Sequence, residues 1–495
     1  MAYLLFALAI SAAYITSCFV SWYRLRHFAG PTLGRFSYAW MMKTALSGRA
    51  WQIHMETKEK YGDALIRIGP DVLITDDPAI IRRMNAARSP YKRDKWYNSF
   101  RSDPHVHSMF TTDDDELHND IKSKTAAAYS GKDVPTLEAD IDGQLLCFKD
   151  LIRRKYLSTA GDTKPMDLGR TAQYLTIDSI TKLAFGRQWG CLATDSDVNK
   201  FIQTVEDVAA FYVLCCDVPW MRRIFLNDLT LMIIGPKDTD PEGMGANEQS
   251  RQESGHRTGS FIRHGLSRRH CEAEVPLAVA AGSDTTAGII RGTMLYILTT
   301  PHVYRRLQDE IDEAIASSRA SSPVVSHAEA KKLPYLQDSH HVLQKAVIYE
   351  GLRIHPPNHI LASKLVPPEG DTLDGKLVPG GTKIAWNVWS LLRRKDVFGQ
   401  DASVFRPERW LEAGADIRIE MERHVELIFG YGRYGCAGKT IALLELNKVF
   451  FELLRDFNFQ ILNPKAPWNE RQYSVFFIRD MWVRVSDRRE DRPSA

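Results

Sequence analysis

The residues best suited to chemistry in this chain lie in one short stretch, residues 429–438, which reads Phe-Gly-Tyr-Gly-Arg-Tyr-Gly-Cys-Ala-Gly. It places Cys436 among four glycines, directly before an apolar run from Thr440 to Leu454. Glycine lets a backbone pass close to a flat ligand, and a helix N-terminus stabilises a thiolate. A thiolate presented by a tight turn suits a haem iron as an axial ligand. The stretch therefore predicts haem ligation by Cys436.

Two nucleotide-binding motifs partly match the same stretch. Residues 430–435 formally fit G-x-G-x-x-G, but that fingerprint belongs to a βαβ unit, and only 60 residues follow it. Residues 438–440 match the end of a P-loop, yet Arg433 stands where its first glycine belongs. A plain glycine loop with a buried free cysteine is the third alternative.

Composition narrows the class of protein. A chain of 495 residues can enclose a ligand of haem size. Its 64 basic and 61 acidic residues nearly cancel, so nothing indicates a nucleic-acid partner. Seven cysteines without a C-x-x-C pair favour neither a zinc site nor a disulfide framework, and fit a reducing compartment.

The N-terminus carries a long uncharged segment. Residues 3–22 hold no charge, and at 1.5 Å per residue a helix of this length spans roughly 30 Å, the thickness of a hydrocarbon core. Arg24, Arg26 and His27 follow and favour a cytosolic position for the rest of the chain. A cleaved signal peptide would have a shorter apolar core, with its positive charge in front. We therefore expect an uncleaved transmembrane helix.

The remaining pattern predicts a mainly α fold with small β-sheets, an α+β class. The segment 235–260, rich in Gly, Pro, Asp and Ser, indicates a surface connection. We expect a transmembrane anchor at 1–23, a hinge at 24–50, a catalytic domain at 51–485 and a polar tail at 486–495. Helices are expected at 138–156, 199–216, 271–299 and 336–353, and short strands at 64–68, 72–75 and within 372–390.

The helix expected at 271–299 contains Ala-Gly-Ser-Asp-Thr-Thr at 281–286. Gly beside Asp and Thr lowers helix propensity by up to about 1 kcal/mol per residue. One interpretation is a groove beside a ligand, faced by the acid Asp284 and the hydroxyl of Thr285. The other is a helix crossing a polar interior, with threonine hydroxyls bonded back to carbonyls.

A second motif combines Glu350 and Arg353, which share one helix face because they are three residues apart. A surface pair of this kind would contribute well under 1 kcal/mol, whereas removing one partner of a buried pair costs about 3–5 kcal/mol. Phe-Arg-Pro-Glu-Arg-Trp follows at 405–410 and ends in Arg409 and Trp410.

Taken together and in order, these stretches resemble the haem-thiolate monooxygenases of the cytochrome P450 family, from the N-terminal segment to about residue 485. Residues 281–286 look like its oxygen-activation segment, Glu350, Arg353 and Arg409 like its structural triad, and 429–438 like its haem loop. The amino-acid sequences at 91–93 and 128–132 are similar to those of fungal secondary-metabolism members of the pisatin-demethylase type.

The resemblance implies haem b as the cofactor, with Cys436 as its metal ligand and Phe429 and Gly430 in the loop beside it. Many members carry an arginine two residues before the cysteine, where this chain has Tyr434; Arg433 is therefore the expected propionate contact.

An early helix of the family places Trp or His four residues before a propionate-binding arginine. This chain has His118 and Lys122 at those positions. Lysine keeps the positive charge but lacks the bidentate fork of arginine, so weaker haem retention is expected.

The implied reaction inserts one oxygen atom from O2 into an apolar small molecule, with electrons from NADPH delivered by NADPH-cytochrome P450 reductase at the endoplasmic reticulum membrane. Asp284 and Thr285 are the expected catalytic residues: Thr285 relays protons through water and Asp284 supplies them. The alternatives are a haem-thiolate isomerase or dehydratase that needs no reductase, and a haem-binding protein without turnover. Candidate pocket residues are Trp96, Tyr97, Phe100 and Phe110 in the loop 94–112, and the segment 358–361.

Overall fold

The computed structural model describes residues 2–235, 237, 256–330 and 343–488. Within these residues helices predominate, and the strands form four small sheets. This agrees with the mainly α class predicted from sequence. Most of the connection predicted at 235–260 and the first residues of the helix predicted at 336–353 lie outside the described residues.

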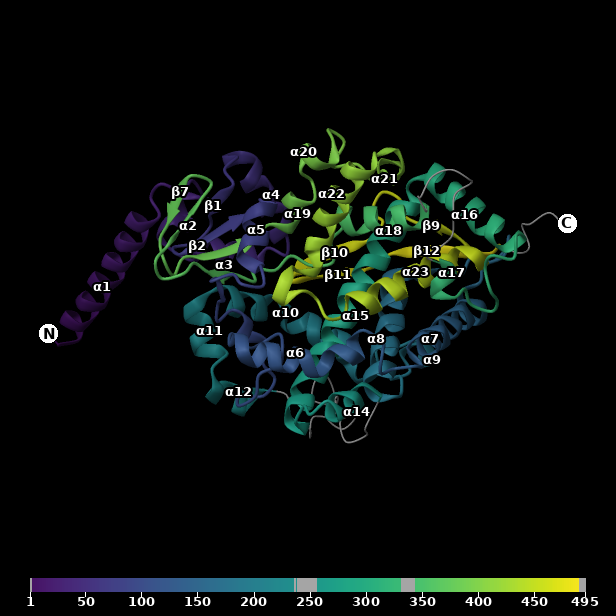
Figure 1. Cartoon of the computed structure of the whole chain (residues 1–495), viewed down its shortest axis with the longest axis horizontal. Helices are drawn as coiled ribbons and strands as arrows, with labels where there is room; N and C mark the ends of the chain where they lie inside the picture. Colours follow the sequence, from purple (N-terminus) through teal and green to yellow (C-terminus); the bar gives the residue numbers. More distant parts are fainter. Residues whose placement is uncertain (1, 236, 238–255, 331–342, 489–495) are drawn as a thin grey trace.

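A helix of 31 residues, α15 (Arg268–Leu298), runs through the centre of the helical body (Figure 1). It begins where the hydroxyl of Ser267 accepts a hydrogen bond from the backbone N–H of His270, and it ends shortly before Pro301 opens α16 (Pro301–Ala316). Apolar residues occur all round it and most are buried, so neighbouring helices enclose it. Those that pack on it include α8 (Leu168–Phe185), α18 (Leu343–Ile354) and α23 (Lys439–Asp456).

The other predicted helices are present. The prediction at 138–156 corresponds to α7 (Leu137–Leu151) continued by the π-helical turn η2 (Ile152–Tyr156), and the one at 199–216 to α10 (Phe201–Asp217). Further helices of the body are α6 (Asp115–Tyr129), α9 (Cys191–Thr194), α11 (Pro219–Phe225), α12 (Asp228–Ile234), α14 (His256–Arg263), α17 (His327–Ala330), α19 (Val388–Leu391), α20 (Lys395–Phe398), α21 (Glu408–Glu412) and α22 (Ala415–Val425).

A five-stranded sheet lies at the end of the molecule that carries the N-terminus (Figure 1). Its central strands β2 and β8 are parallel, and the other pairs are antiparallel. At the edge, Arg93 lies directly opposite Lys364, which brings two cations from distant parts of the chain together. The strand order is β1 (Leu65–Arg67), β2 (Val72–Thr75), β8 (Lys383–Trp386), β5 (Lys364–Leu365) and β3 (Lys92–Arg93).

The remaining sheets have two or three strands each. Two are hairpins, and the third joins the C-terminal strands to the short strand before α8. They are β6 (Asp371–Leu373) with β7 (Lys376–Val378), β10 (Asn469–Tyr473) with β11 (Val475–Arg479), and β4 (Met166–Asp167) with β12 (Trp482–Asp487) and β9 (Phe457–Ile461).

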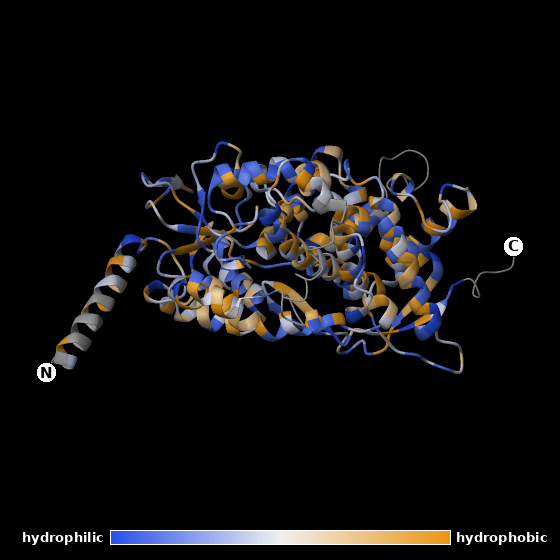
Figure 2. Cartoon of the chain, turned by 90° about the horizontal axis from the view of Figure 1, so that it is seen from below, coloured by the Kyte–Doolittle hydropathy of each residue, from blue (hydrophilic) through white to orange (hydrophobic). Residues whose placement is uncertain are grey.

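The N-terminal segment forms α1 (Ala2–Arg24), which stands away from the body (Figures 1 and 2). Searching the described residues finds no helix that combines the length and the apolar character needed to cross a membrane. The family resemblance and the uncharged sequence remain the grounds for the predicted anchor.

The predicted hinge at 24–50 is largely folded against the sheet. It contains α2 (Thr32–Phe36) and α3 (Ala39–Leu46) and leads into α4 (Ala50–Tyr61). Gly30 lies so close to the sheet that a Cβ there would be 1.9 Å from the carbonyl oxygen of Arg67. The guanidinium of Arg67 in turn donates to the carbonyl oxygens of Ser21 and Trp22. This segment therefore packs as part of the body, while the domain boundaries remain predictions.

Candidate functional site

The cysteine loop forms a tight turn that begins at the 3-10 turn η5 (Glu426–Phe429) and ends where helix α23 begins. A second 3-10 turn, η6 (Gly432–Tyr434), lies within it, before Cys436. The backbone N–H of Cys436 donates to the carbonyl oxygen of Phe429 at 2.6 Å. Gly430 and Gly432 have φ of 76° and 59°, and a Cβ on Gly432 would lie 2.3 Å from the carbonyl oxygen of Asn85. The loop therefore requires glycine at these two positions.

Cys436 is solvent-exposed on one side, although protein atoms surround the rest of the residue. This enclosure raises the pKa of its thiol, while the backbone amides of Gly438 and Lys439 and the charge of Lys122 act in the opposite direction. These amides belong to the start of α23, where the helix dipole favours a negative charge. A metal ion bound at the sulfur would complete deprotonation.

Four cations gather beside this loop: Arg93, Lys122, Lys364 and Arg433. Lys122 donates to the carbonyl oxygen of Arg433 at 2.5 Å, which ties α6 to the loop. The ammonium of Lys364 is fully buried and has no hydrogen-bond partner. It lies 3.2 Å from the centre of the Tyr434 ring. Burial and the neighbouring positive charge of Arg93 lower the pKa of Lys364 to about 6.

Asp115 is the carboxylate that meets this cluster. It pairs with Arg433 at 2.7 Å and accepts a hydrogen bond from the hydroxyl of Tyr434. Arg433 also donates to the carbonyl oxygen of Ala87 at 2.7 Å. The ring of His118, on the same helix as Asp115, lies 4.8 Å from the ring of Tyr434. One acid faces four bases, so positive charge is in excess here.

These residues fit a haem. The cysteine loop presents a thiol at a helix N-terminus, and the unpartnered ammonium of Lys364 calls for an anion such as a haem propionate. The structure places all the haem-binding residues predicted from sequence on or beside this loop: Cys436, Phe429, Gly430, Arg433, His118 and Lys122.

The predicted catalytic pair lies in the middle of α15. Asp284 is buried and accepts a hydrogen bond from the side-chain amide of Gln173, on α8, at 2.5 Å. Burial raises the pKa of Asp284 to about 6, against the opposing effect of Arg291. Thr285 is only partly buried, and its hydroxyl donates to the carbonyl oxygen of Ala281 at 2.6 Å. Ala281 itself is exposed. The two residues therefore point in different directions, and the threonine lies on a less buried face of α15 than the acid.

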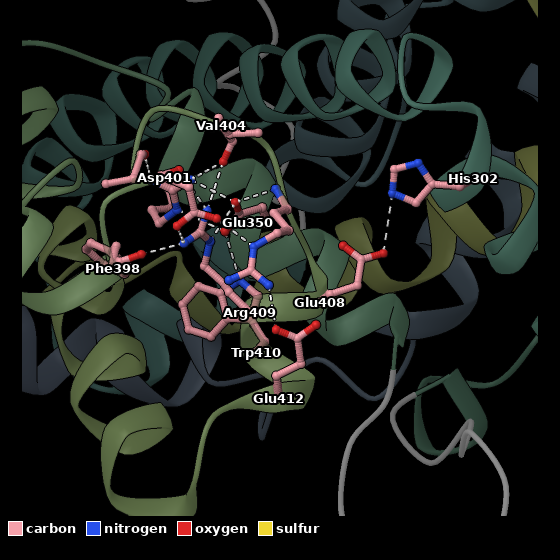
Figure 3. A network of polar contacts seen from close by, with 12 residues as sticks. His302, Glu350, Phe398, Asp401, Val404, Glu408, Arg409, Trp410 and Glu412 are labelled. Carbon is pink, nitrogen blue, oxygen red and sulfur yellow. Dashed lines mark hydrogen bonds and ion pairs between the residues drawn. The ribbon is translucent and has the colours of Figure 1, made fainter.

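The predicted pairing of Glu350 with Arg353 and Arg409 is confirmed (Figure 3). Arg353 donates to both carboxylate oxygens of Glu350 at 2.7 and 2.8 Å, and Arg409 donates to one at 3.0 Å. The indole N–H of Trp410 also donates to a carboxylate oxygen of Glu350, at 2.9 Å. All these side chains are buried, so the network holds α18 to the segment before α22. The exposed contact of His302 with Glu408 lies to one side of it.

The aromatic residues of the loop 94–112 pack mainly against one another. Trp96 and Tyr97 are buried, and the rings of Phe100 and Phe110 lie 5.6 Å apart in the same cluster. The segment 358–361, by contrast, contributes three of its four residues to the wall of a pocket.

Sequence reasoning gave no role to Arg93, Lys364, Asp115 or Gln173. Arg93 and Lys364 meet only because β3 pairs with β5, and a single sequence contains no signal for that pairing. Gln173 is an ordinary helix residue until α8 packs on α15.

Comparison with known proteins agrees with this geometry. The model of the cytochrome P450 family matches residues 31–479. A cytochrome P450 monooxygenase ABA1 of Pyricularia oryzae is 43% identical over 97% of this chain and 96% of its own length. Another, aba1 of Botryotinia fuckeliana, is 41% identical over 94% of this chain and 92% of its own length. Among solved structures, a cytochrome P450DA heme domain superposes with a TM-score of 0.72 at 16% identity, covering 94% of this chain and 98% of that one.

The chain belongs to the cytochrome P450 family. The predicted family and its helix-rich fold with small sheets are thereby confirmed, while the N-terminal transmembrane helix stays a prediction. The nucleotide-binding alternatives for the glycine loop are wrong.

Proposed function

We propose that this protein is a membrane-bound, reductase-dependent monooxygenase that inserts one oxygen atom from O2 into an apolar small molecule of fungal secondary metabolism. The observation that carries the proposal is the acid–alcohol pair, with a buried Asp284 and a Thr285 on a less buried face of α15, in a chain with a complete cysteine loop. An isomerase or a haem carrier has no use for such a proton relay.

The residues that would hold haem are Cys436 through its sulfur, and Lys122, Lys364, Arg93 and Arg433 through the propionates. Bound haem supplies oxygen activation, since a thiolate ligand donates electron density that favours O–O cleavage.

The protein's own contribution is proton control. Asp284, with its pKa raised to about 6, is mostly ionised at pH 7 but keeps a minor protonated fraction of roughly one-tenth, so it can both give and take a proton. Thr285 carries the hydroxyl that passes the proton on through water. The side-chain amide of Gln173 fixes the carboxyl of Asp284 during this exchange.

Attachment to the endoplasmic reticulum membrane is supported by the uncharged segment 3–22 and by a second apolar region on α10, α11 and α12. Large apolar side chains are exposed there, and exposed apolar clusters of this kind mark interaction surfaces. Arg223, which is exposed on α11, lies among them and suits an anionic lipid surface. The exposed residues are Val208, Phe211, Trp220, Ile224, Leu229, Met232 and Ile233.

The test is reconstitution of the full chain with NADPH-cytochrome P450 reductase in vesicles, using isotopically labelled O2 and a set of apolar candidate substrates. The proposal requires product that depends on NADPH and reductase and carries one labelled oxygen atom. Product formed from a peroxide without NADPH or reductase would instead indicate an isomerase or dehydratase. A haem-loaded protein that turns over none of the candidates would indicate a carrier.

A further inference from the structure

A small pocket lies between α3, α4, the C-terminal end of α10 and the turn between β10 and β11. It holds about 390 Å³ of space, part of it open to solvent. Its apolar wall includes Met41, Val213 and Leu361, and its polar wall includes His54, His359 and Gln472. The enclosed part has room for about one water-sized group. A single oxygen-bearing group fits there, whereas a hydrocarbon skeleton does not.

Two buried histidines form the floor of this pocket. Nδ1 of His54 and Nε2 of His359 are 2.6 Å apart and share one hydrogen bond. Burial lowers the pKa of His54 to about 4 and that of His359 well below its usual range, so both rings are neutral at pH 7. In a neutral pair one ring donates and the other accepts. The second ring nitrogen of His359 is then a donor or an acceptor, according to the tautomer.

Two polar atoms of the wall residues have no hydrogen-bond partner among the described residues. These are Nδ1 of His359 and the side-chain oxygen of Gln472, and both residues are more than nine-tenths buried. The amide nitrogen of Gln472 is already committed, because it donates to the backbone oxygen of His359 at 3.0 Å. A buried polar atom without a partner destabilises the protein, and a bound group that completes both hydrogen bonds recovers the lost energy.

The charge of the wall selects among oxygen-bearing groups. None of the residues that line the pocket is a lysine or arginine, and Asp217 is among them. Burial raises the pKa of Asp217 to about 7, so it carries partial negative charge near neutral pH. Arg222 acts on Asp217 from outside the wall and pairs with Asp94, so a carboxylate or phosphate in the pocket would meet the acid with no cation of the wall to bind it. A hydroxyl is neutral, and it both donates to Gln472 and accepts from His359.

A short stretch of chain connects the pocket to α15. A Cβ at Gly288, one helical turn beyond Thr285 on α15, would lie 3.8 Å from Pro357. The chain from Pro357 to His359 spans at most roughly 7 Å. His359 therefore lies within roughly two residues of the chain segment that packs on α15 one turn beyond Thr285.

We propose that the pocket binds the hydroxyl group of a neutral, otherwise apolar substrate, with His359 and Gln472 as its hydrogen-bond partners. The inference rests on the proposed function for calling this molecule a substrate, and it names the substrate class: an alcohol that is oxidised at a position away from its existing hydroxyl.

Calorimetric titration of the full-length holoprotein tests the proposal with three probes of one skeleton: 4-phenylcyclohexanol, phenylcyclohexane and 4-phenylcyclohexanecarboxylate. We expect the alcohol to bind roughly tenfold or more tightly than the hydrocarbon, because only the alcohol satisfies both buried atoms. Equal affinity of the alcohol and the hydrocarbon, or tightest binding of the carboxylate, would overturn it.

The variant Gln472→Leu should weaken the alcohol roughly tenfold and leave the hydrocarbon unchanged. Gln144→Leu is the matched control, since Gln144 on α7 is equally buried, has an unpartnered side-chain oxygen and lies outside the pocket. Equal weakening of both probes by Gln472→Leu would mean that the residue only supports the fold. Calorimetry needs no turnover, so a failed labelled-oxygen assay with intact alcohol selectivity would count against the proposed function alone.

Discussion

Lys364 is the residue whose charge is least balanced within the site. Its ammonium is buried beside Arg93 without a hydrogen-bond partner, and its pKa is lowered from 10.5 to about 6. Between these values the unfolded chain keeps the proton and the folded chain does not. Lys364 therefore contributes a stability to the haem-free protein that increases as the pH rises from about 6 towards 10.

We predict that Lys364→Met removes this pH dependence. The change in the urea midpoint of haem-free protein from pH 6 to pH 9 should be more positive in the native chain than in the variant, by an amount corresponding to about 1 kcal/mol or more. Lys345→Met, at an exposed lysine paired with Glu422, should behave like the native chain. An unchanged slope in Lys364→Met would show that the lysine is not buried as a free base.

Thr285 illustrates a catalytic role that depends on one hydroxyl. We predict that Thr285→Ala keeps the fold and haem content but consumes NADPH with roughly tenfold less product, releasing hydrogen peroxide instead, because general acid–base groups contribute at least this much. Product and peroxide per NADPH are the quantities to measure.

Thr299→Ala is the control for that variant. Thr299 caps the C-terminus of the same helix and makes the same type of bond to the carbonyl oxygen four residues earlier, at 2.8 Å, but far from the motif 281–286. Both variants lose the same back-bond, so only a proton-relay role separates them. Equal coupling of NADPH to product in the two variants would refute that role.

At the scale of elements, the conformation of the loop between η5 and α23 is stable only where no Cβ collides with neighbouring backbone. We predict that Gly432→Ala destabilises the protein by roughly 1–3 kcal/mol and lowers its haem content, because φ is 59° and the added carbon would meet Asn85. Gly435→Ala is the comparison: its φ is −59° and its Cβ would lie 3.4 Å from the nearest oxygen. Thermal unfolding and haem absorbance report both effects, and equal losses would contradict this reading of the loop.

Elements also show how far sequence reasoning reached. Apolar spacing located α10, α15 and α23 to within a few residues, because local periodicity determines where a helix forms. The cysteine loop was recognisable because its glycines are required locally. The cation cluster was not, since Arg93, Lys122, Lys364 and Arg433 come from four separate elements that only tertiary packing joins. The pairing of Glu350 with Arg353 was predictable because both lie on one helix, whereas the bond between Gln173 and Asp284 needs two helices.

At the scale of the whole molecule, the sheet at the N-terminal end and the helical body around α15 each contribute different residues to the site. The body encloses Asp284 and the Glu350 network, while β3 and β5 at the edge of the sheet carry two of the four cations to the cysteine loop. The segment predicted as a hinge is packed on this sheet, because Gly30 and Gly34 allow the chain to lie directly on the backbone of β1 and the residue after it.

The central claim is that Cys436 ligates a haem iron as a thiolate. Its most direct test is the carbon-monoxide difference spectrum of the reduced full-length protein in membranes, beside that of Cys436→Ser. We predict the strongly red-shifted Soret band of a thiolate ligand in the native chain and its complete loss in the variant. The same band in Cys436→Ser, or no haem absorbance in well-folded native protein, would contradict the account.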